Sequence, residues 1–128
     1  MNYIKHKSEE SVEDYLETIL ILSKRLPVVR SIDIANELSY SKPSISVAMK
    51  NLKASSYITV SDEGYISLTK TGRKLAETVY ERHTILSDML IRLGVAPETA
   101  LADACRMEHD ISPESFQAIK KHIQNLRK

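Results

Sequence analysis

The sequence predicts a mostly α-helical fold with one small β-hairpin. Three observations favour this class: apolar residues recur at helical spacing in six segments, two short alternating runs flank a turn, and the composition is that of a globular chain. Of the 128 residues, 42% are hydrophobic and 27% are charged. Such a chain can bury a core, and its length suits one domain or two small units.

The first three helices are expected in the N-terminal part of the chain. The first runs from Ser8 or Ser11 to about Arg25, a second covers residues 32–38, and Ser41 is a good N-cap for a third. Apolar residues of the first helix fall on one side: Val12, Tyr15, Leu16, Ile19, Leu20 and Leu22. The third helix has the same pattern at Ile45, Ala48, Met49 and Leu52.

Two alternating runs, residues 57–60 and 65–68, predict the hairpin, with Gly64 supplying the positive φ of its turn. Two short helices joined by a tight turn and followed by a hairpin are the order of a winged helix-turn-helix. In that motif the third helix enters the major groove of DNA. We therefore predict a winged helix-turn-helix DNA-binding domain over residues 1–74.

Three further helices predict a helical metal-binding and dimerisation domain over residues 75–128. Thr69 caps a long helix that Gly94 ends, and a fifth helix runs from Pro97 to about Asp110. The sixth helix, which starts at Ser112-Pro113, has an apolar seam too narrow for a fully buried helix: Phe116, Ile119, Ile123 and Leu126. This seam and the wide apolar arc of the long helix predict a homodimer.

The predicted third helix has a small, hydroxyl-rich and cationic outward face. The segment from Leu38 to Ala76 has six basic and two acidic residues, although the net charge of the chain is only +1. Such a surplus permits nucleic-acid binding but is also typical of a solvated face, and a protein–protein adaptor remains the alternative. The predicted DNA-binding residues are Ser41, Lys42, Pro43, Ser44, Ser46, Val47 and Lys50.

On the fifth helix, Glu108 and His109 lie with Leu101, Ala104 and Cys105 on the side that we expect to be packed. A buried carboxylate needs a cation, a hydrogen-bond network or a metal. Cys105, Glu108 and His109 are spaced i, i+3 and i+4, so their side chains can converge on one point. Thiolate, carboxylate and imidazole are all metal donors.

Three more residues can bind a metal. Asp14 and Glu17 lie one turn apart on the first helix, opposite its apolar stripe, and Ile21 lies between them. His83 lies at the edge of the apolar arc of the long helix. Taken singly, the acids are more typical of a solvated face and the histidine of a satisfied core residue.

Five stretches together resemble the diphtheria toxin repressor family of iron- and manganese-dependent regulators, most closely its short manganese transport regulator branch. These stretches are residues 13–17, 33–35, 68–72, 80–83 and 105–109. The resemblance extends to about Leu126. It implies a homodimeric, metal-activated repressor of metal-uptake genes, with the metal held between the first helix and the dimerisation domain.

Residue by residue, the resemblance implies that Asp14, Glu17, His83, Glu108 and His109 are ligands of Mn(II) or Fe(II). At the position of Asp14, manganese regulators have aspartate and iron regulators methionine. Cys105 is the departure, because the manganese branch has a bridging glutamate there and the iron branch a cysteine. The site thus mixes the two patterns. Ser87 stands where a glutamate often occurs, which weakens any ancillary site around His83.

We expect a cytoplasmic protein without enzymatic activity, membrane span or small-molecule substrate. Its single cysteine cannot form an internal disulfide, and its longest apolar run, residues 19–22, is far too short for a membrane span. Two alternatives stay open: a winged-helix regulator that needs no metal, and a small metalloenzyme. A gel shift with and without divalent metal separates all three, because the first binds DNA equally in both conditions and the second in neither.

Overall fold

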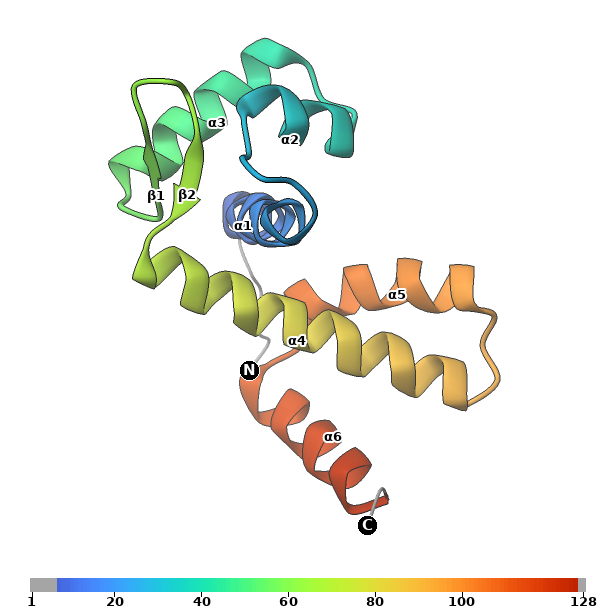
Figure 1. Ribbon diagram of the computed structural model, residues 1–128. Helices are drawn as coiled ribbons and strands as arrows, with labels where there is room; N and C mark the ends of the chain where they lie inside the picture. The colour runs from blue at the N-terminus through green and yellow to red at the C-terminus, as the bar shows by residue number, and fades with distance from the viewer. Residues whose placement is uncertain (1–6, 127–128) are drawn as a thin grey trace. The chain divides into compact units, whose positions relative to one another are not determined.

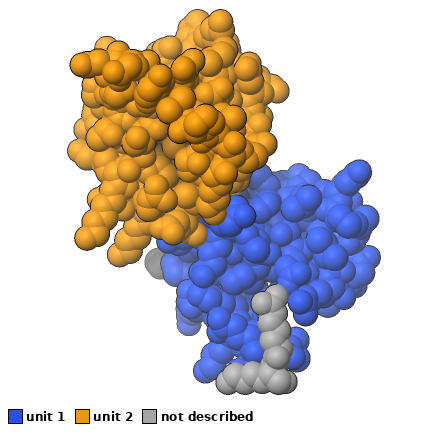
Figure 2. Space-filling view, in the orientation of Figure 1, with its two compact units in different colours: residues 1–10, 78–128 blue, residues 11–77 orange. Residues whose placement is uncertain are grey.

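The computed structural model describes residues 7–126 and confirms the predicted class, with six helices and a two-stranded hairpin (Figure 1). The chain forms two compact units (Figure 2). One comprises residues 11–77, and the other comprises residues 78–128 together with residues 1–10. Within the described residues, no helix has both the length and the apolar character needed to cross a membrane.

Three helices make up most of the unit of residues 11–77: α1 (Lys7–Arg25), α2 (Ser31–Leu38) and α3 (Lys42–Ala54). The predicted inward face of α1 is confirmed at its centre, because Leu16, Ile19 and Leu20 are almost completely buried. The first two apolar positions of α1 are only half-buried. The other helices of this unit bury Ile34, Ala35, Ile45, Met49 and Leu52.

The turn between α2 and α3 is tight and well bonded. Ser39 adopts the left-handed conformation with φ 58°, and Tyr40 donates its backbone N–H to the Ala35 carbonyl at 3.1 Å. Ser41 then caps α3 as predicted, because its Oγ accepts a hydrogen bond from the Ser44 N–H at 3.3 Å. The α2–α3 pair therefore has the short connection that a helix-turn-helix requires.

The wing pairs β1 (Ile58–Val60) with β2 (Ile66–Leu68) in antiparallel register, Thr59 opposite Ser67. Gly64 takes the expected positive φ of 85° in the turn. The Ile66 N–H donates to the Val29 carbonyl at 2.8 Å, so the segment that follows α1 lies along the outer edge of β2. This bond fixes the wing to the rest of the unit.

At the base of the wing, α4 (Lys70–Arg92) begins against β1. Thr69 caps α4 as expected, since its Oγ1 accepts the Gly72 N–H at 3.1 Å, and the same hydroxyl donates to the Ser56 carbonyl at 2.7 Å. The backbone N–H of Thr69 donates to the Tyr57 carbonyl at 3.0 Å. A Cβ atom on Gly72 would lie 2.0 Å from that carbonyl oxygen, so glycine is required for this close approach.

The second unit contains most of α4 together with α5 (Pro97–Asp110) and α6 (Pro113–Leu126). Figure 1 shows α5 returning beside α4 after a short connection, where Gly94 has a φ of 103° and ends α4 as predicted. Leu86, Ala104 and Phe116 form the centre of the core of this unit, one residue from each helix. The seam of α6 is only partly buried, and Leu126 at its end is exposed.

Replacing Gly72 with alanine is expected to destabilise the protein by about 3 kcal/mol, the upper end of the range for overpacking, because the new methyl group meets backbone rather than a flexible side chain. Thr71→Ala, at the exposed neighbouring position of α4, is the matched control and should change stability by less than about 0.5 kcal/mol. Urea denaturation followed by circular dichroism measures both. Equal midpoints for the two variants would contradict this packing.

Candidate functional site

The exposed face of α3 contains every residue predicted to bind DNA. The helix begins with Lys42 and Pro43, Pro43 fits the first turn because its missing N–H has no intrahelical role, and α3 has no acidic residue. Val47 is 61% exposed although it is apolar. All seven residues are exposed: Ser41, Lys42, Pro43, Ser44, Ser46, Val47 and Lys50. Their exposure agrees with the predicted outward face, and their role in DNA binding stays a prediction.

The tip of the wing differs in charge from α3. The turn between β1 and β2 carries Asp62 and Glu63, both exposed, and residues 57–69 include no lysine or arginine. A phosphate backbone would therefore be attracted to α3 and repelled by the wing tip. In this unit α3 therefore has a cationic surface suited to nucleic acid, whereas the wing tip does not.

Glu108 is the most unusual residue of the second unit, because its side chain is completely buried. Its Oε2 lies 2.9 Å from Nδ1 of His83, and its Oε1 lies 3.5 Å from Nε2 of His109. His109 is buried as well. One ligand atom of each of Cys105, Glu108 and His109 lies within 4.8 Å of the others, and His83 joins them through Glu108. Within this unit the structure thus brings together four of the six residues predicted to bind metal, from α4 and α5.

The Glu108 carboxylate fits a metal ligand better than a structural ion pair. Its Oε1 accepts no hydrogen bond within the part of the chain that is described, although burial makes an unsatisfied oxygen costly. Carboxylate and imidazole are donors that first-row divalent ions accept. A cation bound here would complete the coordination of Oε1 and offset the burial of the charge.

Arg82 supports the end of α5 that contains Glu108 and His109. Its guanidinium donates to the carbonyl oxygens of Glu108 at 3.2 Å and Ile111 at 3.4 Å, and it lies over the Phe116 ring, 5.6 Å from the centroid. Sequence reasoning assigned no role to Arg82. The one sequence feature that could have pointed to Arg82 was its position directly before His83 on a helix that is only half apolar.

The packed side of α5 differs from the expected one. We expected Leu101 and Cys105 to be packed, but both are exposed, and the buried stripe is formed by Ala100, Ala104 and Glu108. The reason is that the small alanines allow close packing against the core of this unit, so the buried arc is centred one residue earlier. Cys105 remains one turn before Glu108 and His109 on the same helix.

Asp14 and Glu17 lie on α1 in the other unit, one helical turn apart. Glu17 is buried and Asp14 is half-buried, so this face of α1 is not the solvated face of which the two acids, taken singly, are more typical. Tyr15 directly follows Asp14. Partial burial raises the pKa of Tyr15 above its usual 10.0, and the nearby Tyr40 and Asp14 raise this pKa further by smaller effects. The sequence patterns did not predict that Tyr15 and Tyr40 lie close together.

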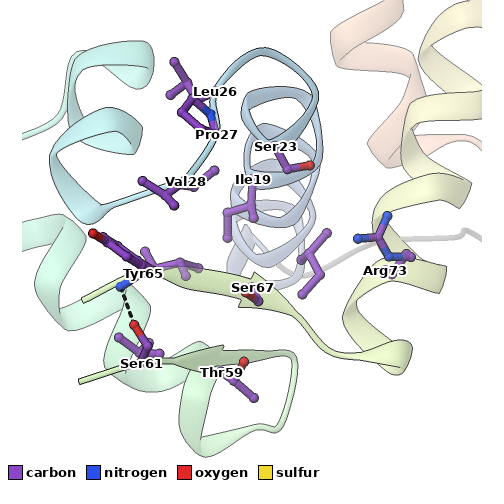
Figure 3. Close-up of a pocket in the computed structure, with 14 residues that line it drawn as sticks. Ile19, Ser23, Leu26, Pro27, Val28, Thr59, Ser61, Tyr65, Ser67 and Arg73 are labelled. Carbon is purple, nitrogen blue, oxygen red and sulfur yellow. Dashed lines mark hydrogen bonds between the residues drawn. The ribbon is translucent and has the colours of Figure 1, made fainter. Parts of the chain in front are cut away.

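A groove of about 460 Å³ lies within the unit of residues 11–77, between the C-terminal half of α1, the segment that follows it, and the wing (Figure 3). Apolar side chains such as Ile19 and Val28 alternate with hydroxyl groups along it, and Arg73 is the only charged residue in its lining. None of the six residues predicted to bind metal lines this groove.

Two families match the chain. Residues 7–66 match the family described as iron dependent repressor, N-terminal DNA binding domain. Residues 69–128 match the family described as iron dependent repressor, metal binding and dimerisation domain. The exposed cationic α3 lies in the first match, and the His83–Glu108–His109 cluster lies in the second.

Relatives with known names are similar along most of the chain. It is 36% identical over 115 residues to the transcriptional regulator MntR of Escherichia coli O6:H1, which is 90% of this chain and 74% of that protein. It is 31% identical over 114 residues to the HTH-type transcriptional regulator MntR of Geobacillus kaustophilus, 89% of this chain and 81% of that protein.

Solved structures agree on the fold. The manganese regulator SloR superposes with a TM-score of 0.78 at 27% identity, and the metal-dependent transcriptional regulator MtsR with 0.82 at 23% identity, a likeness of fold alone. Each comparison covers 88% of this chain and 53% of the other. The chain therefore spans about half the length of these two proteins.

Glu108→Gln is expected to abolish most of the stabilisation that a divalent ion gives. Cobalt(II) at one hundred times its Kd should raise the unfolding free energy of the wild type by about 2.7 kcal/mol, and a hundredfold loss of affinity would reduce this gain to about 0.4 kcal/mol. Guanidinium denaturation with and without cobalt measures the difference. Glu114→Gln, at an exposed position of α6, is the control, and an equal gain in both variants would argue against Glu108 as a ligand.

Proposed function

The chain belongs to the iron-dependent repressor family of metal-responsive transcriptional regulators, also named after the diphtheria toxin repressor, and we propose that it represses metal-uptake genes when it binds Mn(II) or Fe(II). The observation that carries this proposal is the buried Glu108 carboxylate between two imidazoles, in the part of the chain that matches a metal-binding and dimerisation domain. The protein would act in the cytoplasm as a homodimer on double-stranded operator DNA.

The proposed ligand set combines donors from α1 and from the helices of the second unit. It comprises Asp14, Glu17, His83, Cys105, Glu108 and His109. Carboxylates suit manganese or iron, whereas the Cys105 thiolate favours iron over manganese. When bound, the ion supplies positive charge and fixed coordination geometry. This is the ordinary role of a metal in a structural rather than a catalytic site, and we propose no enzymatic activity.

We propose the same division of labour between two domains that the sequence indicates. Residues 1–74 bind DNA, and residues 75–128 hold metal ligands and the dimer contacts. Because the ligand set draws on both domains, metal would favour one arrangement of them, and DNA that prefers that arrangement would be coupled to metal binding. The coupling is reciprocal, so operator DNA would also tighten metal binding.

Binding to operator DNA should be weak in chelator and at least about tenfold tighter with manganese(II) or iron(II), a coupling of about 1.4 kcal/mol or more. The measurement is fluorescence anisotropy of a labelled duplex selected from a random pool with the metal-loaded protein. The protein must be shown to be metal-free at the start. Equal affinity in both conditions would favour a metal-independent winged-helix regulator instead.

Within α3, Lys50 and Val47 should affect DNA binding differently. Lys50→Ala should weaken binding to all sequences and reduce the salt slope by about 1, as the loss of one phosphate contact does. Val47→Ala should instead relax the preference at one or two base pairs, because the exposed side chain suits a thymine methyl. Lys121→Ala, an exposed lysine of α6, is the control. An unchanged salt slope for Lys50→Ala would contradict this orientation of α3.

A further inference from the structure

An aromatic pair joins α1 to the turn before α3. The rings of Tyr15 and Tyr40 meet edge to face, with centroids 6.3 Å apart and planes at 78°. Both residues belong to the unit of residues 11–77. Edge-to-face geometry is a favourable arrangement of two aromatic rings, because the positive edge of one meets the negative face of the other. The pair is therefore a specific tertiary contact.

Tyr15 stands at the point where α1 changes from a half-buried to a buried helix. Residues 12–14 are half-buried, and Leu16 and the four residues that follow it are buried. Tyr15 also directly follows Asp14, a proposed metal ligand. A restraint applied at Asp14 therefore reaches Tyr15 through one peptide unit of a helix.

Tyr40 stands directly before Ser41, the N-cap of α3. Its side chain is 52% exposed, and Tyr15 is its one aromatic contact among the described residues. Its backbone is held by the tight turn that includes Ser39. Tyr15 is thus the contact that orients an otherwise solvated ring at the end of α3 where the DNA-binding residues begin.

We propose that the Tyr15–Tyr40 pair is the contact through which metal binding at Asp14 acts on the start of α3, with Tyr15 as a positioning residue. This inference rests on the proposed function, and in particular on Asp14 as a ligand. An ion that restrains α1 at Asp14 restrains Tyr15, and Tyr15 then holds Tyr40 and the first turn of α3 in one conformation. DNA that binds this first turn loses less conformational entropy when the turn is already ordered.

Four variants test the proposal in the intact protein. Tyr15→Leu and Tyr40→Leu remove the pair but keep apolar bulk, and Tyr15→Phe keeps the ring. Tyr65→Leu is the matched control, because that tyrosine of the same unit packs its ring against Arg30 instead. For each variant, anisotropy gives the affinity for the selected duplex with and without manganese(II), and paramagnetic resonance of free manganese gives the metal affinity without DNA.

We expect Tyr15→Leu and Tyr40→Leu to lower the DNA affinity of the manganese-loaded protein by about three- to tenfold, the range of an aromatic pair. Their metal-free DNA affinity and their metal affinity without DNA should stay within about twofold of wild type. Tyr15→Phe and Tyr65→Leu should keep the full metal dependence. Tyr40→Leu keeps the test valid if Tyr15→Leu fails to fold, because Tyr40 lies at the surface.

An equal loss of DNA affinity with and without manganese would overturn the proposal, because the pair would then only stabilise the DNA-binding unit. Unchanged affinities in both leucine variants would overturn it as well. A wild-type protein whose DNA affinity depends on neither manganese(II) nor iron(II) would contradict the proposed function itself. That result is obtained before any variant is measured, so the two failures are distinguishable.

Discussion

The carboxylate of Glu108 is the constraint to which the helices of the second unit are adapted. A charge removed from water needs compensation, and here α4 supplies one imidazole while α5 supplies another on the next residue of its own turn. Arg82 donates to the carbonyls of Glu108 and Ile111 at the end of α5, so the turn that contains Glu108 is held through both its side chains and its backbone. An apolar residue at position 108 would need no such compensation, and this core would then lack its completely buried carboxylate.

In the unit of residues 11–77, hydrogen bonds around the turns have the same organising role. The caps of α3 and α4 and the bond between Ile66 and Val29 satisfy backbone groups that tight connections leave open. They fix where α3 begins and how the wing is attached. The exposed face of α3 can then be small and polar, because it contributes little to stability and is available for a ligand.

Much of this fold could be predicted from the sequence because its boundaries depend on local chemistry. Ser41, Thr69 and Gly94 act through hydrogen bonds or φ angles within a few residues, and all three have the predicted roles. The prediction that Cys105 lies on the packed side of α5 was wrong. Helical periodicity is recognised mainly from large apolar residues, whereas the packed stripe of α5 contains alanines. The contacts of Arg82 and the Tyr15–Tyr40 pair join distant segments, and no local pattern encodes such partners.

The wing combines a fixed base with an independent tip. Its base is locked where the Tyr57 carbonyl meets Thr69 and the backbone of Gly72, whereas the turn of residues 61–64 is held by bonds within itself, from Ser61 to Tyr65 and to Gly64. The tip is therefore a modular segment. Its length and charge can diverge between related proteins, or be exchanged by grafting, while the register of α4 is preserved. Evolution can thus adjust the electrostatics of this hairpin separately from the helices that contain the proposed metal ligands.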